Sequence, residues 1–366
     1  MSALKDLYTP AFYSGIAKCM RESIPGFDEP AFMKLIYSPA FDAMELKARM
    51  KHTAVCLQHF MPDSYQAAVI LLQGLVDRLR AHGFWQERLE MMFLPNYIEV
   101  YGLDDLETSL DGMEFVTQYV SCEFAIRPFL NKYFDQTISR MLTWTQHPHA
   151  RVRRLASEGC RPRLPWGLSV PTLKKDPAPL LPILEALKDD PDEAVRRSVA
   201  NNLNDISKEH PEFVVKIAQA WKGHSKETDA IIKHGCRSLL KRGHASVLDH
   251  YGLNSDGLSL DDFSILSPEV KIGDSLSFTF RIHNTTEKSK TVRLEYAIYY
   301  RKANTQLNKK VFKISERIYQ GGQAETITRN QSFKLITTRR FYEGGHVLEM
   351  IVNGSVMAKG EFIVYN

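Results

Sequence analysis

The sequence predicts a multidomain chain, in which an all-α, HEAT-like array of helical repeats is followed by an all-β, immunoglobulin-like sandwich. Three observations support this prediction. Apolar residues recur at helical spacing over residues 30–250, a short motif repeats after 43 residues, and the apolar period changes to two after Gly257. With 366 residues, the chain is long enough for two domains. We expect a repeat domain over residues 1–250 and a sandwich over residues 258–366.

The helical prediction rests on amphipathic segments. After the turn at residues 61–64, apolar residues share one helical face, and Asp63 or Ser64 can cap the first turn. The apolar residues of this face are Ala68, Leu72, Leu75, Val76 and Leu79.

The repeat prediction rests on two similar segments. Residues 147–154 (HPHARVRR) resemble residues 190–197 (DPDEAVRR), and a weaker third copy begins at Arg237, 40 residues after Arg197. Periods of about 40–47 residues are typical of HEAT and armadillo arrays. We expect each proline to start the second helix of a repeat and the arginines after it to lie along the concave face. Alternatively, these arginines only solvate a helix.

The sandwich prediction rests on alternation. Apolar and polar residues alternate over residues 276–282 and 292–298, which is typical of half-buried strands. Asn353-Gly354 predicts a hairpin turn, and the pairs Gly321-Gly322 and Gly344-Gly345 predict further turns. About seven short strands in a hundred residues fit an immunoglobulin-like sandwich without its disulfide.

Composition and motifs restrict the function classes. The five cysteines lie far apart without a C-x-x-C pair, which is typical of buried thiols in a reducing compartment. Residues 1–6 show no secretory signal, and no apolar stretch approaches the ~18 residues of a membrane span, so we predict a cytoplasmic protein without a membrane partner. Nucleotide-binding glycine motifs are absent, and His52, His59, His147 and His149 lack a metal-ligand partner pattern, so we predict no cofactor, no nucleotide and no metal.

Positive charge is concentrated in two places. Residues 258–366 carry 16 Lys and Arg against 11 Asp and Glu, whereas residues 1–257 are nearly balanced. Residues 140–170 hold six arginines, and Glu158 is their only acid. Local basic patches of this kind indicate contact with a polyanion.

The densest part of this patch is residues 151–167, where five arginines surround Glu158 ahead of a Pro-Trp-Gly turn. If a helix runs from Pro148 through Ser157, Arg151, Arg154 and Glu158 lie on one face. Such a face would bind phosphate around one carboxylate.

The run RRLASEGCRPRLPWG in this segment resembles the signature of the AlkC family, a branch of the AlkD-like HEAT-repeat DNA glycosylases. The likeness covers residues 1–250, and the C-terminal sandwich is similar to one that some members carry. The resemblance implies a monofunctional glycosylase that excises 3-methyladenine and 3-methylcytosine from double-stranded DNA as a monomer. It also implies that the lesion stays stacked during excision, a route that the sequence itself leaves open.

The implied chemistry requires carboxylates. Alkylation at N3 makes the base cationic and a good leaving group, so what remains is to stabilise an oxocarbenium-like sugar and to direct a water. Glu158 is the first candidate, the resemblance adds Glu123, and Asp205 in the next repeat is a third acidic candidate. Alternatively, Glu123 pairs with Arg127 or lies on a helix surface, and Asp205 is a cap or a surface residue.

Further residues are predicted to contact the DNA. Trp166 can present an aromatic face to the cationic base or the deoxyribose, or else fill the core between repeats. Six arginines are predicted to hold phosphates, although each can instead pair with a helix end: Arg151, Arg154, Arg161, Arg163, Arg197 and Arg237. Residues 140–170 contain no lysine, so we expect no Schiff-base step there.

Two other functions stay open. The chain can be a non-catalytic HEAT-repeat protein that binds DNA, or a protein-interaction scaffold whose sandwich binds a partner strand at its edge. The two DNA-binding hypotheses differ at Glu158, because a phosphate binder gains nothing from that carboxylate. The sandwich itself is either a second DNA grip or a spacer whose lysines, at positions 302, 309, 310 and 313, protect edge strands.

Overall fold

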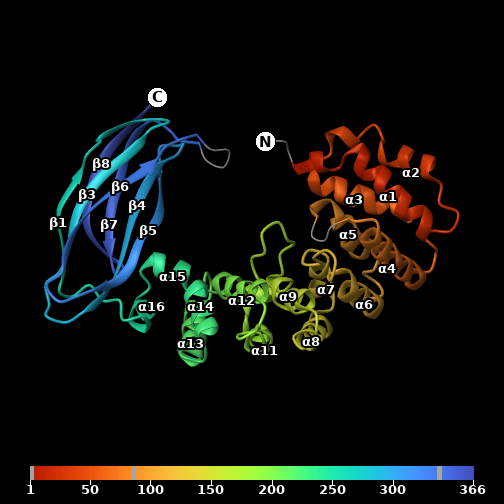
Figure 1. Cartoon of the computed structure of the whole chain (residues 1–366), viewed down its shortest axis with the longest axis horizontal. Coiled ribbons are helices and arrows are strands. Elements are labelled where there is room, and N and C mark those ends of the chain that lie inside the picture. The colour runs from red at the N-terminus through yellow and green to blue at the C-terminus, as the bar shows by residue number, and fades with distance from the viewer. Residues whose placement is uncertain (1–3, 85–87, 336–339) are drawn as a thin grey trace. The chain divides into compact units, whose positions relative to one another are not determined.

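The computed structural model describes residues 4–84, 88–335 and 340–366. Within these ranges the chain is helical up to His250 and forms strands from Leu258 onward (Figure 1). Its contacts divide it into two compact units, which we call the helical unit, up to Gly235, and the sandwich unit, from Cys236. None of the helices in the described part of the chain is long and apolar enough to cross a membrane.

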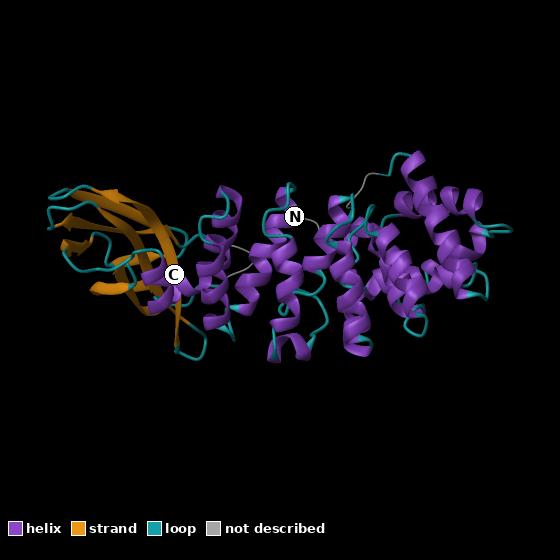
Figure 2. Cartoon of the chain, turned by 90° about the horizontal axis from the view of Figure 1, so that it is seen from below, coloured by secondary structure: helices purple, strands orange, loops and turns teal. Residues whose placement is uncertain are grey.

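The helical unit is a succession of short helices (Figure 2). Its α-helices are α1 (Pro10–Ser23), α2 (Glu29–Ile36), α3 (Leu46–Gln58), α4 (Tyr65–Ala81), α5 (Phe93–Tyr101), α6 (Leu106–Val116), α7 (Ile126–Lys132), α8 (Phe134–Trp144), α9 (Ala150–Glu158), α10 (Pro171–Lys175), α11 (Leu181–Ala186), α12 (Glu193–Ile206), α13 (Pro211–Trp221) and α14 (Lys226–Gly235). Short 3-10 turns lie at Leu4–Leu7, Phe41–Ala43, Leu89–Met92 and Ala178–Leu180.

The predicted cap of α4 is confirmed, because the hydroxyl of Ser64 accepts a hydrogen bond from the Ala67 amide. The 43-residue repeat is confirmed at α9 and α12, where His149 and Asp192 occupy the same N-cap position. The prediction that the prolines start these helices is wrong: each proline precedes the cap, whose side chain must be free to accept from the first-turn amides.

The third copy of the repeat is also wrong. Arg197 lies in the second turn of α12, whereas Arg237 is the first residue of the six-residue helix α15 and belongs to the sandwich unit. The next helix of this layer that packs on α12 is α14, which begins at Lys226 and therefore before Arg237.

The arginine pair of each repeat divides into two roles. Arg153 binds both carboxylate oxygens of Asp190 and donates to the carbonyls of residues 147 and 148. Arg196 donates to the carbonyls of residues 190 and 191 in the same way. The first arginine of each pair therefore fixes the start of its own helix, which corrects the expectation that all of them lie along a concave face. The second arginines differ: Arg154 contacts Glu123 and Glu158, and Arg197 has no ion-pair partner among the described residues.

The paired helices form two layers. In Figure 1, α9, α12 and α14 follow one another in one layer, and α8, α11 and α13 lie in the other. Helix α9 packs on both α8 and α12, and Leu155 of α9 and Leu203 of α12 are fully buried. The Asn202 amide donates to the Ser157 carbonyl at 2.9 Å, which brings the C-terminal ends of α9 and α12 together.

The sandwich unit contains two short helices and, in its described part, eight strands in two sheets, one strand more than predicted. The elements are α15 (Arg237–Arg242), α16 (Ala245–His250), β1 (Leu258–Ile265), β2 (Glu269–Lys271), β3 (Ser275–Asn284), β4 (Lys290–Arg301), β5 (Leu307–Tyr319), β6 (Ala324–Ser332), β7 (Gly344–Val352) and β8 (Ser355–Tyr365). The sheet orders are β1-β3-β6 and β2-β8-β7-β4-β5. Alternate residues of β3, among them Phe278 and Phe280, point into the shared core.

The turns of the sandwich agree with two of the three predictions. Asn353 and Gly354, with φ of 48° and 82°, form the tight turn between β7 and β8, and Gly321-Gly322 lies between β5 and β6. Gly344-Gly345 instead begins β7. The predicted lysine cluster lies partly on β5, an edge strand, where Lys309 pairs with Glu349, a placement that fits the edge-protection alternative.

The cap of α9 predicts a pH dependence of stability. His149 accepts from the Arg151 amide through Nδ1, which requires a neutral ring. Burial, followed by the charge of Arg151, lowers the pKa of His149 below its ordinary 6.5. Between the lowered pKa of His149 in the folded chain and the ordinary pKa of 6.5, the folded chain binds fewer protons than the unfolded chain. The free energy of unfolding therefore falls as the pH drops below about 6.5.

We expect the variant His149→Asp, which copies Asp192 of the next repeat, to remove this part of the pH dependence. The Tm of wild type and variant would be compared at about pH 7.5 and about pH 5.5. Because an N-cap contributes about 1 kcal/mol, this is the size of the stability loss expected for the wild type at the lower pH. An equal loss of Tm on acidification in both proteins would contradict the assignment.

Candidate active site

The three predicted acids lie in one row of alternating charges. Arg154 contacts Glu123 at 3.0 Å and Glu158 at 3.7 Å. Arg161 contacts Glu158 at 2.6 Å and Asp205 at 2.9 Å. We call these five residues the acid row. The structure thus brings together residues that are up to 82 positions apart in the sequence.

Two of the carboxylates lie at helix C-termini. Glu158 is the last residue of α9, and Asp205 is the last but one of α12. A helix C-terminus carries partial negative charge, so a carboxylate there is unfavourable unless a cation compensates it. Both residues are nevertheless buried, with 6% and 2% exposure. Each of these two buried carboxylates therefore requires a cation beside it.

The buried Arg161 holds the two helix ends together. Burial alone lowers its pKa, but the charges of Glu158 and Asp205 and their hydrogen bonds outweigh burial, so the net pKa is raised above its ordinary value. Its side chain is 9% exposed and is committed to two carboxylates. In place of the predicted phosphate contact, Arg161 therefore bridges two carboxylates of the acid row.

Within the described part of the chain, two carboxylates each keep one oxygen that accepts from no protein donor. Glu158 uses Oε1 for both arginines, and Glu123 uses Oε2 for Arg154 and for the Ser121 hydroxyl. Among the described residues, none donates to Oε2 of Glu158 or Oε1 of Glu123. Asp205 differs, because Arg161 and Lys208 occupy both of its oxygens. The alternatives for the acids are wrong: Glu123 does not pair with Arg127, and Asp205 is neither a cap nor a surface residue.

The remaining predicted arginines are not equivalent. Arg151 donates to the Tyr119 carbonyl at 2.8 Å, and Arg163 pairs with Glu209. Arg237 belongs to the sandwich unit. Arg197 is exposed and makes no hydrogen bond or ion pair with the residues that the structure describes.

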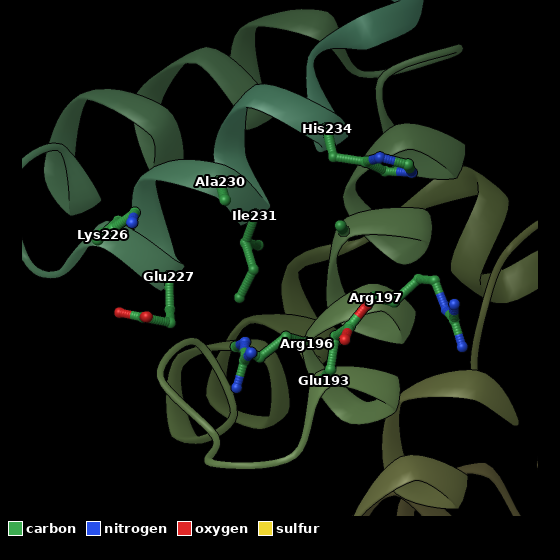
Figure 3. Close-up of a pocket in the computed structure, with 9 residues that line it drawn as sticks. Glu193, Arg196, Arg197, Lys226, Glu227, Ala230, Ile231 and His234 are labelled. Atoms are coloured by element: carbon green, nitrogen blue, oxygen red, sulfur yellow. The ribbon is translucent and has the colours of Figure 1, made fainter.

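Arg197 lines a pocket of about 340 Å³ between α12 and α14. Figure 3 shows that Arg196 and Arg197 leave α12 in different directions, with His234 of α14 above the Arg197 side of the pocket. Arg197 and Asp205 lie two helical turns apart on α12, so the free guanidinium and the acid row share one helix. No group of three or more metal-ligating side chains occurs within residues 4–84, 88–335 and 340–366.

Trp166 lies on the loop that follows α9. It is 59% exposed, so the alternative that it fills the core is wrong. Its φ of +64° is in the left-handed region, which a bulky residue adopts only when its surroundings hold it. Figure 1 shows this loop rising from the helical layer between α9 and α12.

Sequence reasoning missed three residues of this neighbourhood. Lys208 binds Asp205 at 3.0 Å, Lys47 donates to the Trp166 carbonyl, and Arg127 donates to loop carbonyls. The Asp205–Lys208 pair has the helical i, i+3 spacing and could have been found once Asp205 was chosen. The contact of Lys47 spans 119 residues, and no local pattern indicates it.

The helical unit has the architecture of a helical-repeat protein, with the acid row at the C-terminal ends of two neighbouring helices. Comparison with known proteins identifies its family. Residues 116–237 match the family described as DNA alkylation repair enzyme. Residues 259–366 match the C-terminal Ig-like domain of the uncharacterised protein YhaZ. The chain is 41% identical over 365 residues to the uncharacterized protein YhaZ of Bacillus subtilis (strain 168), and the match covers 100% of both chains.

A solved structure narrows the class further. The chain is similar, over 100% of both chains, to the alkylpurine DNA glycosylase AlkC of Pseudomonas fluorescens bound to DNA containing an abasic site analog, with a TM-score of 0.93 and 32% identity. The chain belongs to the AlkC family of DNA alkylation repair proteins. Its fold is that of an AlkC-like glycosylase with a C-terminal Ig-like domain.

The bridge through Arg161 predicts a large loss of stability on its removal. In Arg161→Met, two buried carboxylates lose their shared cation, which costs about 3–5 kcal/mol. Arg163→Met is the control, because its exposed pair with Glu209 contributes about 0–1 kcal/mol. Urea unfolding followed by the helical circular dichroism signal measures both, and equal losses would show that the bridge is not a special element of the helical unit.

Proposed function

We propose that the protein is a monofunctional DNA glycosylase that excises cationic alkylated bases, among them 3-methylcytosine and 3-methyladenine, from double-stranded DNA. The observation that carries the proposal is the free carboxylate oxygen on Glu158 and on Glu123, both held in place by arginines. The full-length likeness to an alkylpurine glycosylase supports the reaction class.

The chemistry follows from the charge of the lesion. A base alkylated at N3 leaves as a neutral molecule, so its departure needs no proton donor, and the electron deficit moves to the deoxyribose. The free oxygen of Glu158 would stabilise this oxocarbenium-like sugar and orient a water toward C1′. Glu123 would add its charge on the other side of Arg154. The N-glycosidic bond breaks and its electron pair goes to the departing base, water supplies the hydroxyl of the abasic product, and the free oxygen of Glu158 would accept the proton that this water loses.

Asp205 and Trp166 complete the proposed site. Asp205 would act first through Arg161, which it shares with Glu158. Its own second oxygen becomes available only when Lys208, which is partly exposed, moves to another anion such as a DNA phosphate. Trp166, which is mostly exposed, would meet the cationic base or the sugar with its indole face.

The acid row argues against the binding-scaffold alternative. Three carboxylates consume the charge of Arg154, Arg161 and Lys208, which would otherwise attract phosphates. A surface selected only for DNA affinity would gain from losing these acids. An enzyme that stabilises a cation requires them.

The variant Glu158→Gln tests the catalytic role. The amide keeps the shape of the side chain but removes its charge, so we expect base release to fall by on the order of 100-fold or more while DNA binding persists. Release of free methylated base from a duplex with 3-methylcytosine measures this under single-turnover conditions. Glu209→Gln is the matched control, because Glu209 also pairs with an arginine of the same segment. Rapid excision by Glu158→Gln would refute the role of Glu158, and binding without excision by the wild type would favour the scaffold.

The variant Arg197→Met tests the phosphate contact. Because Arg197 has no partner among the described residues, its loss leaves the fold intact and removes about one phosphate contact. We expect weaker DNA binding, a salt dependence reduced by about one unit of slope, and an unchanged single-turnover rate at saturating protein. Arg21→Met, on the distant helix α1, is the control. A salt dependence equal to that of the wild type would show that Arg197 does not touch the DNA.

A further inference from the structure

The loop between α9 and α10, residues 159–170, connects the two parts of the proposed site. Its first turn carries Arg161, which bridges Glu158 and Asp205. Its tip carries Trp166 in a left-handed conformation. An irregular segment of this length loses much conformational entropy when it is fixed, so its geometry must come from contacts outside the loop.

The main contact is Arg127 of α7. It is 1% exposed and donates to the carbonyls of Gly159 at 2.8 Å, Arg161 at 2.9 Å and Leu168. No carboxylate of the described residues forms an ion pair with it. Burial lowers its pKa to about 10, so the guanidinium stays charged at neutral pH.

An arginine suits this position for a geometric reason. The carbonyls of Gly159 and Leu168 lie at the two ends of the loop, and the planar guanidinium presents several donors in a fixed fork that reaches both. The loop also packs on the side chain itself. A Cβ on Gly167, next to Trp166, would come within 3.0 Å of the Arg127 Cδ, and one on Gly159 within 2.7 Å of the Ile126 Cγ2, so a larger residue at either position would displace its neighbour.

Two further donors hold the tip of the loop. Lys47 of α3 donates to the Trp166 carbonyl, and its ammonium lies 5.0 Å from the centre of the Phe124 ring, next to Glu123. Asn131, one helical turn after Arg127, donates to the Ser169 carbonyl at 3.0 Å. We call Lys47, Arg127 and Asn131 the loop clamp. All of its donors address backbone carbonyls, so it fixes the path of the loop.

We propose that the loop clamp is a positioning device for base excision: Arg127 fixes Arg161 and Trp166 on one rigid loop, so that the indole and the acid row meet the same nucleotide. The inference rests on the proposed function. The residues of the clamp act through the loop and do not touch the reacting atoms. A misplacement of about 1 Å at the loop is enough to slow a reaction by about 100-fold.

The chain offers a matched control for this proposal. Arg49 of α3 is also buried, with 7% exposure, and its guanidinium donates to the carbonyls of Met44, Lys5 and Asp42, far from the acid row in the sequence. The variants Arg127→Met and Arg49→Met each remove a buried guanidinium that serves three carbonyls. Both should therefore lower the Tm, and only Arg127→Met should disturb the site.

The first readout is kinetic. In the full-length protein, we expect Arg127→Met to lower the single-turnover rate of 3-methylcytosine release by about 10-fold to 100-fold, with the Kd for DNA within about threefold of wild type. Arg49→Met should excise at the wild-type rate below its Tm. If both variants slow excision equally, the loss follows stability and the proposal is wrong.

The second readout does not depend on activity. Trypsin cuts after arginine unless proline follows, so of the two loop arginines Arg163 is a target and Arg161, followed by Pro162, is not. We expect brief digestion to cut Arg127→Met, but neither wild type nor Arg49→Met, between Arg163 and Leu164. Equal resistance of that bond in all three proteins would overturn the clamp. If the wild type releases no methylated base, the proposed function fails, and the digestion pattern still decides on the clamp.

Lys47→Met covers the case in which Arg127→Met fails to fold. Lys47 is exposed, so this variant should keep the wild-type Tm, lose excision rate by about threefold to 10-fold and leave the Kd nearly unchanged. An unchanged excision rate would contradict the role of the clamp at Trp166.

Discussion

The bridge that Arg161 makes between the C-terminal ends of α9 and α12 organises the helical unit around its proposed site. Each helix ends in a carboxylate that its own dipole disfavours, and the two ends would repel each other without a cation between them. Because Arg161 is buried, the attraction is screened little by water, but the loss of hydration offsets much of it. Removal of Arg161 alone is costly because it leaves two buried carboxylates without a cation, but the intact bridge adds little net stability, and its main effect is to place Glu158 and Asp205.

The repeat explains how such a bridge can form. Positions about one period apart in a helical array lie on neighbouring helices, and the contacts Arg161–Asp205, Ser157–Asn202 and Arg153–Asp190 span 44, 45 and 37 residues. The 43-residue offset between the prolines therefore points, from the sequence alone, to the region of the chain that holds a partner for Arg161. Helix α12 supplies Asp205 to the arginine that follows α9, because the same supersecondary element occurs twice.

The single acid among five arginines indicated Glu158 as a site residue, and period-two alternation predicted β3 and β4. Other features could not be predicted from such patterns. The predicted helix starts at the prolines were wrong, because a HEAT-like helix can begin with a proline in its first turn or, as here, after a proline and a polar cap. Arg127 and Lys47 act through backbone carbonyls, which every residue has, so no side-chain pattern at the other end indicates the contact. The left-handed backbone of Trp166 is likewise a product of tertiary contacts.

The balance of charge in the acid row separates catalysis from binding. Glu123, Glu158 and Asp205 cancel the charges of Arg154, Arg161 and Lys208, so the centre of a basic region is locally neutral. A neutral DNA base gains little from such a site, because each carboxylate already has a partner. A base that carries a positive charge, or a sugar that acquires one as the bond breaks, can share the free oxygens of Glu158 and Glu123. Since the carboxylates are already fixed by arginines, little reorganisation is needed when that charge develops. The site thus favours substrates whose lesion itself supplies the cation, and this preference requires no pocket that encloses the base.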